Sequence, residues 1–298
     1  MPTLRSPFFY VGDKYKLVPQ LKEHFPAVID RFIEPFCGGG SVFLNVEAGA
    51  YRLNDVDPYM IRLHRFLQGE AGRPDAFFEE VKRRVLAYGL SATFMGRDVP
   101  PEMRREHVKT YFARYNHDAY YRMRSDFNAH KDDLLLLYLL LIYGFNRMLR
   151  FNAAGNFNLP VGNVDFNHNV ETALNAYFET IRGRDVIFEC LDFQQFLHQA
   201  APGRGDFVYC DPPYLITFSE YNKLWNKAEE ERLLDTLDGL DAAGVRFAVS
   251  NVLTHKGRSN ELFTAWAGKY RMVPIQSNYI SYHDNTEKGS AEVLVFNY

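Results

Sequence analysis

The 298-residue sequence contains few cysteines and no long apolar segment. Its three cysteines, Cys37, Cys190 and Cys210, lack the spacing of metal ligands and lie in apolar stretches, so we expect reduced core thiols and no metal site. The longest apolar run, residues 134–142, is too short to span a bilayer and predicts a buried helix. The first residues lack the apolar core of a signal peptide, and we therefore expect a cytoplasmic protein without a membrane partner.

The sequence also lacks a large net charge and a known phosphate-binding loop. A net charge of −3 does not by itself indicate a nucleic-acid-binding protein, although a local basic face can act alone. The glycines at 38–40 are not followed by Gly-Lys-Ser/Thr, which excludes a P-loop, and they do not match the G-x-G-x-x-G pattern of dinucleotide-binding folds. The composition, 47% hydrophobic and 24% charged, is that of an ordinary globular protein with one large domain or two smaller ones.

The most informative stretch is Asp211-Pro212-Pro213-Tyr214, which follows a predicted buried strand at residues 206–210. The prolines end the strand because they donate no backbone hydrogen bond. In open α/β sheets, ligands bind at the carboxyl ends of strands. A carboxylate and a proline carbonyl can both accept hydrogen bonds from one exocyclic amino group, while a tyrosine ring stacks on a flat heterocycle. The stretch therefore predicts a site for a base that carries an amino group.

A second motif is a glycine-rich turn after the predicted strand at residues 31–36. We expect the turn to lead into a helix that begins near Ser41, a good N-cap, and its glycines allow a ligand to approach the backbone. The next predicted strand ends in Asp55 and Asp57. An acid at this point either holds a nucleoside ribose or caps the following helix. Together the turn and the acid favour a nucleoside cofactor.

The N-terminal stretch, residues 8–14, has two interpretations. Its aromatic residues predict a strand and turn that pack on the core, and this stretch alone favours that interpretation. Alternatively, Tyr10 and Lys14 contact a ligand as a ring and a cation.

Residues 67–160 lack strand signals and predict an inserted helical subdomain. Between Arg97 and Arg150 there are ten basic and seven acidic residues, an excess of positive charge in an otherwise acidic chain. The insert closes with a predicted β-hairpin around residues 152–155. Its Asn, Arg and Phe side chains are the types that contact or wedge nucleic-acid bases, although an exposed hairpin without a special role fits the same pattern.

The α/β pattern then resumes. We expect a strand at 185–191, which ends at Asp192 and Phe193, before the central strand at 206–210. The remaining expected elements are helices at 170–181 and 228–240, strands at 244–251, 270–274 and 291–298, and a polar loop at 281–290.

Five stretches, taken in order, resemble the α group of the Dam-type N6-adenine-specific DNA methyltransferases, which use S-adenosylmethionine. The resemblance implies an α/β, Rossmann-like methyltransferase fold with an inserted, mainly helical target-recognition subdomain that carries a β-hairpin. It places the catalytic, cofactor-binding domain at residues 1–66 and 166–298 and the DNA-binding insert at 67–165. The stretches are residues 10–14, 34–41, 54–55, 146–162 and 211–214, and residues 292–298 match the last strand of the family.

The resemblance also implies roles for individual residues. Tyr10 stands where many members have Trp, and Asp13 where a second Gly is usual. The implied catalytic residues are Asp211, Pro212, Pro213 and Tyr214. The implied cofactor-binding residues are Tyr10, Lys14, Phe36, Gly38, Gly39, Ser41, Asp55, Asp192, Phe193 and Asp211. The implied DNA-binding residues are Phe145, Asn146, Met148, Arg150, Asn152 and Pro160, with Arg150 at the guanine before the target adenine.

The implied reaction is methyl transfer to N6 of a flipped-out adenine in a short duplex site that begins GA, with GATC as one candidate. The rival functions are methylation of adenine N6 or cytosine N4 in another nucleic acid, and DNA binding without catalysis. A protein-glutamine methyltransferase is disfavoured as a rival, because such enzymes usually carry Asn in place of Asp211. We expect a monomer that acts on double-stranded DNA, and a cognate restriction endonuclease remains open as a partner.

Overall fold

A computed structural model describes residues 2–217, 225–276 and 290–298, which form two compact units. Unit 1 comprises Met1–Asp13, Gly38–Leu44 and Asp57–Gly183, and unit 2 comprises Lys14–Cys37, Asn45–Val56 and Arg184–Tyr298. Compact units need not coincide with functional domains, so the division at residues 67 and 165 stays a prediction. Almost all of the polar loop expected at 281–290 lies outside the described residues.

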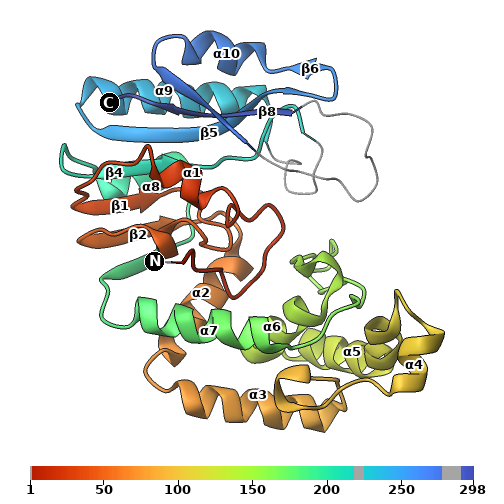
Figure 1. The fold of residues 1–298 in the computed structure, drawn as a ribbon. Coiled ribbons are helices and arrows are strands. Elements are labelled where there is room, and N and C mark those ends of the chain that lie inside the picture. Colours follow the sequence, from red (N-terminus) through yellow and green to blue (C-terminus); the bar gives the residue numbers. More distant parts are fainter. Residues whose placement is uncertain (1, 218–224, 277–289) are drawn as a thin grey trace. The chain divides into compact units, whose positions relative to one another are not determined.

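Unit 2 is built on a mixed sheet that has eight strands in the part of the chain that the structure describes (Figure 1). The strand order is β3-β2-β1-β4-β5-β8-β7, with β6 paired to β5. Neighbours from β3 to β5 are parallel, whereas β8 is antiparallel to both β5 and β7. This confirms the expected Rossmann-like α/β fold. The strands are β1 (Arg31–Glu34), β2 (Ala50–Asn54), β3 (Val186–Glu189), β4 (Phe207–Cys210), β5 (Arg246–His255), β6 (Arg258–Ser259), β7 (Arg271–Ile275) and β8 (Ser290–Phe296).

The strand order reverses between β1 and β4. From β1 the chain adds β2 and β3 on one side and then returns to add β4 on the other. Ligands in such sheets bind outside the carboxyl ends of the strands, at this switch point. The fold therefore directs attention to the residues that follow β1 and β4.

Four helices of unit 2 belong to the described residues, and three of them pack on one face of the sheet. These three, α8 (Phe193–Ala200), α9 (Lys227–Ala242) and α10 (Glu261–Ala267), contribute Phe196, Leu234 and Phe263 to one apolar cluster with the strands. The fourth is α1 (Val18–Lys22). The sequence pattern does not predict α8 and α10, because with 8 and 7 residues they are too short to show a clear helical period.

Unit 1 is helical. Its centre is α6 (Leu134–Tyr143), in which every residue from Leu135 onward is buried, and this confirms the buried helix expected from the apolar run. Within residues 2–217, 225–276 and 290–298, no helix combines the length and apolarity that a membrane crossing requires. The other elements are α2 (Pro58–Glu70), α3 (Pro74–Tyr88), α4 (Pro101–Glu106), α5 (Tyr111–Ala129), α7 (His168–Ile181) and the 3-10 turns η2 (Thr93–Met95) and η3 (Phe145–Arg147).

The helix expected to begin near Ser41 was predicted wrongly. Only a 3-10 turn, η1 (Phe43–Asn45), forms after the glycines. The Tyr51 hydroxyl donates to the Val46 carbonyl at 2.7 Å and accepts from the Ala48 amide at 3.1 Å. These bonds hold the backbone directly after η1 in a turn toward β2, so a helix cannot extend through it.

Candidate active site

Four parallel strands bring the predicted site residues of unit 2 to one edge of its sheet. Asn54 lies opposite Glu189, Glu34 opposite Leu53, and Ile33 opposite Val208, so β3, β2, β1 and β4 end at the same edge. The segments that leave this edge carry, in sheet order, Asp192, Asp55, Phe36 and Asp211. The sheet therefore groups residues that are far apart in the sequence.

Asp211 belongs to a cluster of four polar side chains within unit 2. Lys14 is only 6% exposed, and its Nζ lies 2.9 Å from Asp211 Oδ1. The Tyr214 hydroxyl lies 3.0 Å from both Asp211 Oδ1 and Glu292 Oε1. Lys14 Nζ also lies 5.0 Å from the centre of the Tyr214 ring. Lys14 and Tyr214 thus contact one oxygen of Asp211. Glu292 was not predicted to be a site residue.

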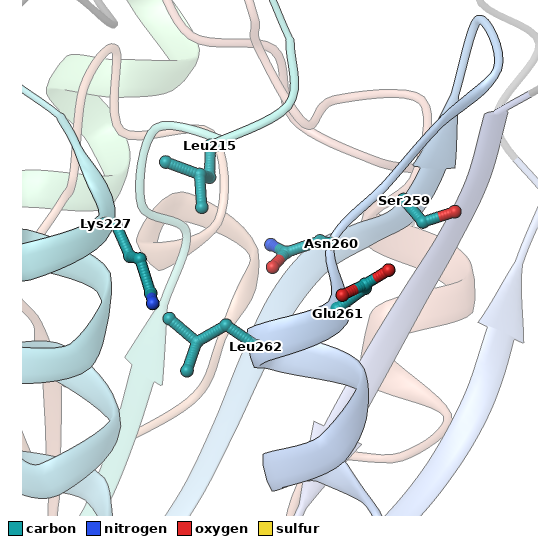
Figure 2. Close-up of a pocket in the computed structure, with 6 residues that line it drawn as sticks. All are labelled: Leu215, Lys227, Ser259, Asn260, Glu261 and Leu262. Carbon is teal, nitrogen blue, oxygen red and sulfur yellow. The ribbon is translucent and has the colours of Figure 1, made fainter.

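A cavity of about 490 Å³ is lined in part by Leu215, the residue that follows Tyr214 in the sequence (Figure 2). Of the described residues that line it, none is a predicted site residue. Its lining residues are Leu215, Lys227, Ser259, Asn260, Glu261 and Leu262.

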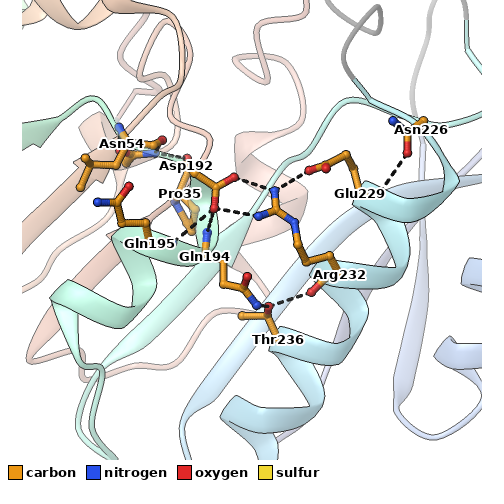
Figure 3. Close-up of polar contacts among 10 residues, drawn as sticks. Pro35, Asn54, Asp192, Gln194, Gln195, Asn226, Glu229, Arg232 and Thr236 are labelled. Atoms are coloured by element: carbon orange, nitrogen blue, oxygen red, sulfur yellow. Dashed lines mark hydrogen bonds and ion pairs between the residues drawn. The ribbon is translucent and has the colours of Figure 1, made fainter.

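Asn54 fixes the segments that carry Phe36 and Asp192 (Figure 3). Its buried Nδ2 donates to the carbonyls of Pro35 and Leu191, both at 3.0 Å. Its Oδ1 accepts from the Leu191 amide at 2.9 Å. Asn54 belongs to one of the stretches that resemble the family, but no role was predicted for it. The available signal was a polar residue at the end of an otherwise apolar strand, where only a structural hydrogen-bonding role allows burial.

Of the two acids after β2, Asp57 is the helix cap. Its carboxylate accepts from the amides of Tyr59 and Met60, at 2.9 and 3.4 Å, and so begins α2. Asp55 is half-buried, and its own amide donates to the Glu189 carbonyl at 3.3 Å. The capping role left open for Asp55 therefore falls to Asp57.

Asp192 caps α8 and pairs with Arg232 (Figure 3). The Arg232 guanidinium donates to both carboxylate oxygens, at 3.0 and 2.6 Å, and lies 4.5 Å from the centre of the Phe193 ring. Burial raises the pKa of Asp192, but the guanidinium and the amides of α8 outweigh it and hold the pKa below its ordinary value. Asp192 is thus a rigid, ionised acceptor at neutral pH.

Three aromatic rings meet beside this pair. The centre of the Phe36 ring lies 5.4 Å from that of Phe193 and 5.7 Å from that of Trp225, and the Phe193 and Trp225 ring centres are 6.0 Å apart. The Trp225 indole donates to the fully buried Glu230 at 3.0 Å, which fixes the orientation of the ring. Two of the rings were predicted to be part of the site, and Trp225 was not. It follows the Asp-Pro-Pro-Tyr stretch at a distance that no sequence rule specifies.

The glycine turn is held within unit 1. The Gly38 carbonyl accepts from His64 Nε2 at 2.8 Å, and the Gly39 carbonyl accepts from the Ser6 hydroxyl at 2.5 Å. A Cβ added to Gly39 would lie 3.0 Å from Tyr10 Cβ. The structure therefore brings Tyr10 and the glycines together, and Ser41 is buried after them. His64 was not predicted from the sequence.

The N-terminal strand expected at residues 8–9 is absent from the described segment. Phe8 and Phe9 are buried, as expected for a stretch that packs on the core, but they occupy turns. Phe9 has φ +49°, a left-handed conformation that is incompatible with a strand.

The predicted hairpin forms a tight turn without regular strands. Its described residues make the isolated bridges Gly144–Val161 and Phe151–Phe157, and backbone bonds such as that from the Asn158 amide to the Arg150 carbonyl, at 3.0 Å, join its two arms. Asn152 Oδ1 accepts from the amides of Ala154 and Asn156, both at 3.0 Å. Asn152 therefore shapes the turn.

Arg150 stabilises the hairpin through two hydrogen bonds to Asn158. Its Nε donates to Asn158 Oδ1 at 2.9 Å, and its Nη2 donates to the Asn158 carbonyl at 2.8 Å. The Nε and Nη2 nitrogens of the guanidinium therefore bond within the hairpin, whereas Nη1 takes part in neither of these two bonds.

The other predicted DNA-binding residues lie before or after this turn. Phe145 is 51% exposed, and its amide donates to the Pro160 carbonyl at 2.9 Å. Asn146 is exposed with φ +53°, and Met148 is half-buried. Strained backbone and an exposed aromatic ring are typical of binding surfaces.

None of the three cysteines, all of which the structure describes, forms a disulfide bond. Cys37 and Cys210 are buried, whereas Cys190 is only partly covered. Burial, with a smaller contribution from nearby carboxylates, raises the pKa of Cys37 well above its ordinary value, so its thiol is unreactive at neutral pH. Among the residues that the structure describes, no three His, Cys, Asp or Glu side chains form a group that could hold a metal ion.

Comparison with known proteins agrees with this arrangement. Residues 10–279 match the model of the D12 class N6 adenine-specific DNA methyltransferases. The chain is 34% identical over 304 residues to the type II methyltransferase M.FokI of Planomicrobium okeanokoites. The aligned region covers 99% of this chain and 43% of that protein. The chain is 32% identical over 309 residues to the modification methylase StsI of Streptococcus sanguinis, with 99% and 43% covered.

A shorter relative is a DNA adenine methylase of Vibrio cholerae, 30% identical over 209 residues, which covers 69% of this chain and 63% of that protein. The chain thus spans less than half of the length of M.FokI and StsI. The family model nevertheless covers most of the chain, including the glycine turn, the hairpin and the Asp-Pro-Pro-Tyr segment. The chain belongs to the D12 class of N6 adenine-specific DNA methyltransferases.

Proposed function

We propose that the chain transfers a methyl group from S-adenosylmethionine to N6 of an adenine in a short duplex DNA site. The observation that carries this proposal is the edge of the sheet in unit 2. There Asp55, Phe36 and Asp211 follow adjacent parallel strands, with Asp211 beside the strand-order reversal. Family membership supplies the class of reaction.

The residues present fit this cofactor. Asp55 supplies a carboxylate for ribose hydroxyls, and Phe36 and Phe193 supply rings for an adenine. Asp192 supplies an ionised acceptor beside those rings. When bound, S-adenosylmethionine supplies an electrophilic methyl group on a sulfonium. The further cofactor contacts that we propose are Tyr10, Lys14, Gly38, Gly39, Ser41 and Asp211.

The glycines fit a close approach to the backbone. Gly38 and Gly40 have φ of +45° and +79°, which favour glycine, and their turn is anchored by His64 and Ser6. A side chain at Gly39 would press on Tyr10. The turn therefore needs small residues for its own geometry, and a ligand would approach its backbone at Gly38, which is partly exposed, whereas Gly39 and Gly40 are buried.

Asp211 and Pro212 carry the chemistry in this proposal. The N6 lone pair of adenine is delocalised into the ring, so the amine is a poor nucleophile. The Asp211 carboxylate and the Pro212 carbonyl accept hydrogen bonds from its two N–H groups and stabilise the positive charge that develops on nitrogen. Alignment of the reacting groups supplies much of the remaining acceleration. Transfer would form the N–C bond as the C–S bond breaks, would leave the sulfur as a neutral thioether, and would let the methylated nitrogen release its extra proton to water.

Tyr214 and Pro213 complete the pocket for the base. The Tyr214 hydroxyl is held between Asp211 and Glu292, so its ring has a fixed position. Stacking on that ring offsets part of the unstacking cost of a flipped-out adenine, a few kcal/mol.

We propose the insert at residues 67–165 as the target-recognition domain. Arg150 is assigned to the guanine before the adenine, so the site begins GA, with GATC as one candidate. Phe145 and Asn146 fill the space left in the duplex. Met148, Asn152 and Pro160 complete the DNA surface. The chain acts as a monomer, and a cognate restriction endonuclease is its candidate partner.

The test is methylation of a randomised plasmid library followed by sequencing with modification detection. We expect N6-methyladenine in one short motif that begins GA. For comparison, methyl transfer from labelled cofactor is measured on matched single-stranded DNA, RNA and cytosine-containing oligonucleotides. Equal transfer to RNA, or transfer to cytosine N4, would favour the rival enzyme functions. DNA binding without transfer to any substrate would favour the non-catalytic alternative.

A further inference from the structure

Glu292 is a buried carboxylate beside the proposed catalytic acid. It lies on β8, opposite Val252 of β5 and Ile275 of β7, and is 3% exposed. Its Oε1 lies 3.0 Å from the Tyr214 hydroxyl and 3.8 Å from Lys14 Nζ. A carboxylate is seldom buried in an internal strand unless it is paired, because the loss of hydration is costly. These two partners, Tyr214 and Lys14, are also the side chains that contact Asp211.

The charges of this cluster indicate what Glu292 contributes. Lys14 is buried and lies 2.9 Å from Asp211 Oδ1, so by itself it would cancel most of the negative charge of Asp211. A second carboxylate next to the same ammonium leaves the group with one net negative charge. The proposed reaction needs that charge, because positive charge develops on the adenine amine beside Asp211.

Glu292 also restricts the Tyr214 hydroxyl. This hydroxyl has one proton and lies equally far from two carboxylates, at 3.0 Å from each. Glu292 therefore shares a hydrogen bond that Asp211 would otherwise receive alone, and it holds the ring in place.

We propose that Glu292 is a positioning residue for methyl transfer: it offsets the charge of Lys14 and anchors Tyr214, so that Asp211 stays a strong acceptor for the adenine amine. The inference rests on the proposed function. Glu292 itself does not contact the reacting atoms in this account and acts through its two neighbours.

The test is a double-mutant cycle of Glu292→Gln and Lys14→Gln, with kcat measured in single turnovers. Glu292→Gln keeps an oxygen for Tyr214 but removes the charge, and we expect kcat to fall about tenfold or more. Glu292→Asp keeps the charge and should stay within about threefold of the wild type. In the Lys14→Gln background, Glu292→Gln should change kcat less than about twofold, because no ammonium remains to offset.

Asp238→Asn is the matched control. Asp238 accepts hydrogen bonds from Trp266 and Tyr270 in the same unit, both at 2.8 Å, so its replacement should lower the melting temperature and leave kcat unchanged. An equal cost of Glu292→Gln in both backgrounds would overturn the proposal, since a merely structural residue behaves in that way. If Glu292→Gln does not fold, Glu292→Met, which also removes the charge, gives the same comparison in the two backgrounds.

The two proposals fail in different ways. If the wild-type chain transfers no methyl group to adenine, the proposed function is wrong. If the wild type is active and Glu292→Gln retains full kcat, only the role of Glu292 is wrong.

Discussion

His64 should make the stability of unit 1 depend on pH. Its ring is fully buried, and burial lowers its pKa to about 4. Because the Gly38 carbonyl can only accept, Nε2 carries the proton, and Nδ1 accepts from the Tyr177 hydroxyl at 3.3 Å. The histidine is therefore neutral at physiological pH and holds the glycine turn in that form.

The size of the effect follows from linkage. An unfolded histidine has a pKa near 6.5, so the unfolded state binds more protons than the folded state between pH 6.5 and about 4. The contribution of His64 is fully present above pH 6.5 and is lost as the pH falls toward 4. At 1.36 kcal/mol per pH unit, the loss is about 3 kcal/mol.

The assay is urea unfolding of the wild type and of His64→Gln between pH 7.5 and 4. The difference in unfolding free energy between the two proteins should shrink by about 3 kcal/mol across this range, because glutamine does not titrate. His168→Gln is the control, since the His168 side chain is 83% exposed and its loss should leave the pH dependence close to that of the wild type. A pH-independent difference between wild type and His64→Gln would refute the reasoning.

Three further predictions concern the glycine turn, the hairpin and the aromatic rings. Gly40→Ala should destabilise the protein by about 2–4 kcal/mol, because Gly40 has φ +79° and an added Cβ would lie 2.3 Å from the Phe43 ring. Thermal unfolding measures the loss of stability. The control is Gly69→Ala, whose added Cβ would meet no atom within 4 Å and should not destabilise the protein. Arg150→Ala should cost about 1–3 kcal/mol of discrimination at the cognate guanine in competition binding, and unchanged discrimination would refute the assignment. Adding S-adenosylmethionine should change tryptophan fluorescence in the wild type and in Trp266→Phe but not in Trp225→Phe; a change that persists without Trp225 would argue against a cofactor at its ring.

The edge that carries the proposed site was predictable because strand ends are marked in the sequence. An apolar run that stops at Asp-Pro-Pro, and another that stops at Asn-Asp, each fix where a strand ends. Parallel pairing then brings such ends together without further information. For this reason the strand ends that carry Asp211 and Asp55 could be predicted from the sequence, whereas the role of Phe36 was predicted from the resemblance to the family.

The supporting contacts were not predictable, because they join residues far apart in the chain. Glu292 lies 78 residues from Tyr214 in sequence and His64 lies 26 residues from Gly38, and no spacing rule links either pair. The missing helix after Ser41 has a similar origin, since Tyr51 takes up the backbone groups that follow η1. The hairpin forms isolated bridges in place of regular strands, and the side-chain bonds that Asn152 and Arg150 add to it are not foreseen by local propensity.

The central claim is that the Asp211 carboxylate accepts a hydrogen bond from the adenine amine during transfer. The most direct test is the single-turnover rate of N6-methyladenine formation by Asp211→Asn, measured by mass spectrometry of digested duplex DNA. Asparagine keeps the shape of the side chain and loses the charge, so we expect a rate at least about a hundredfold lower with DNA binding retained. A rate close to that of the wild type would contradict the account.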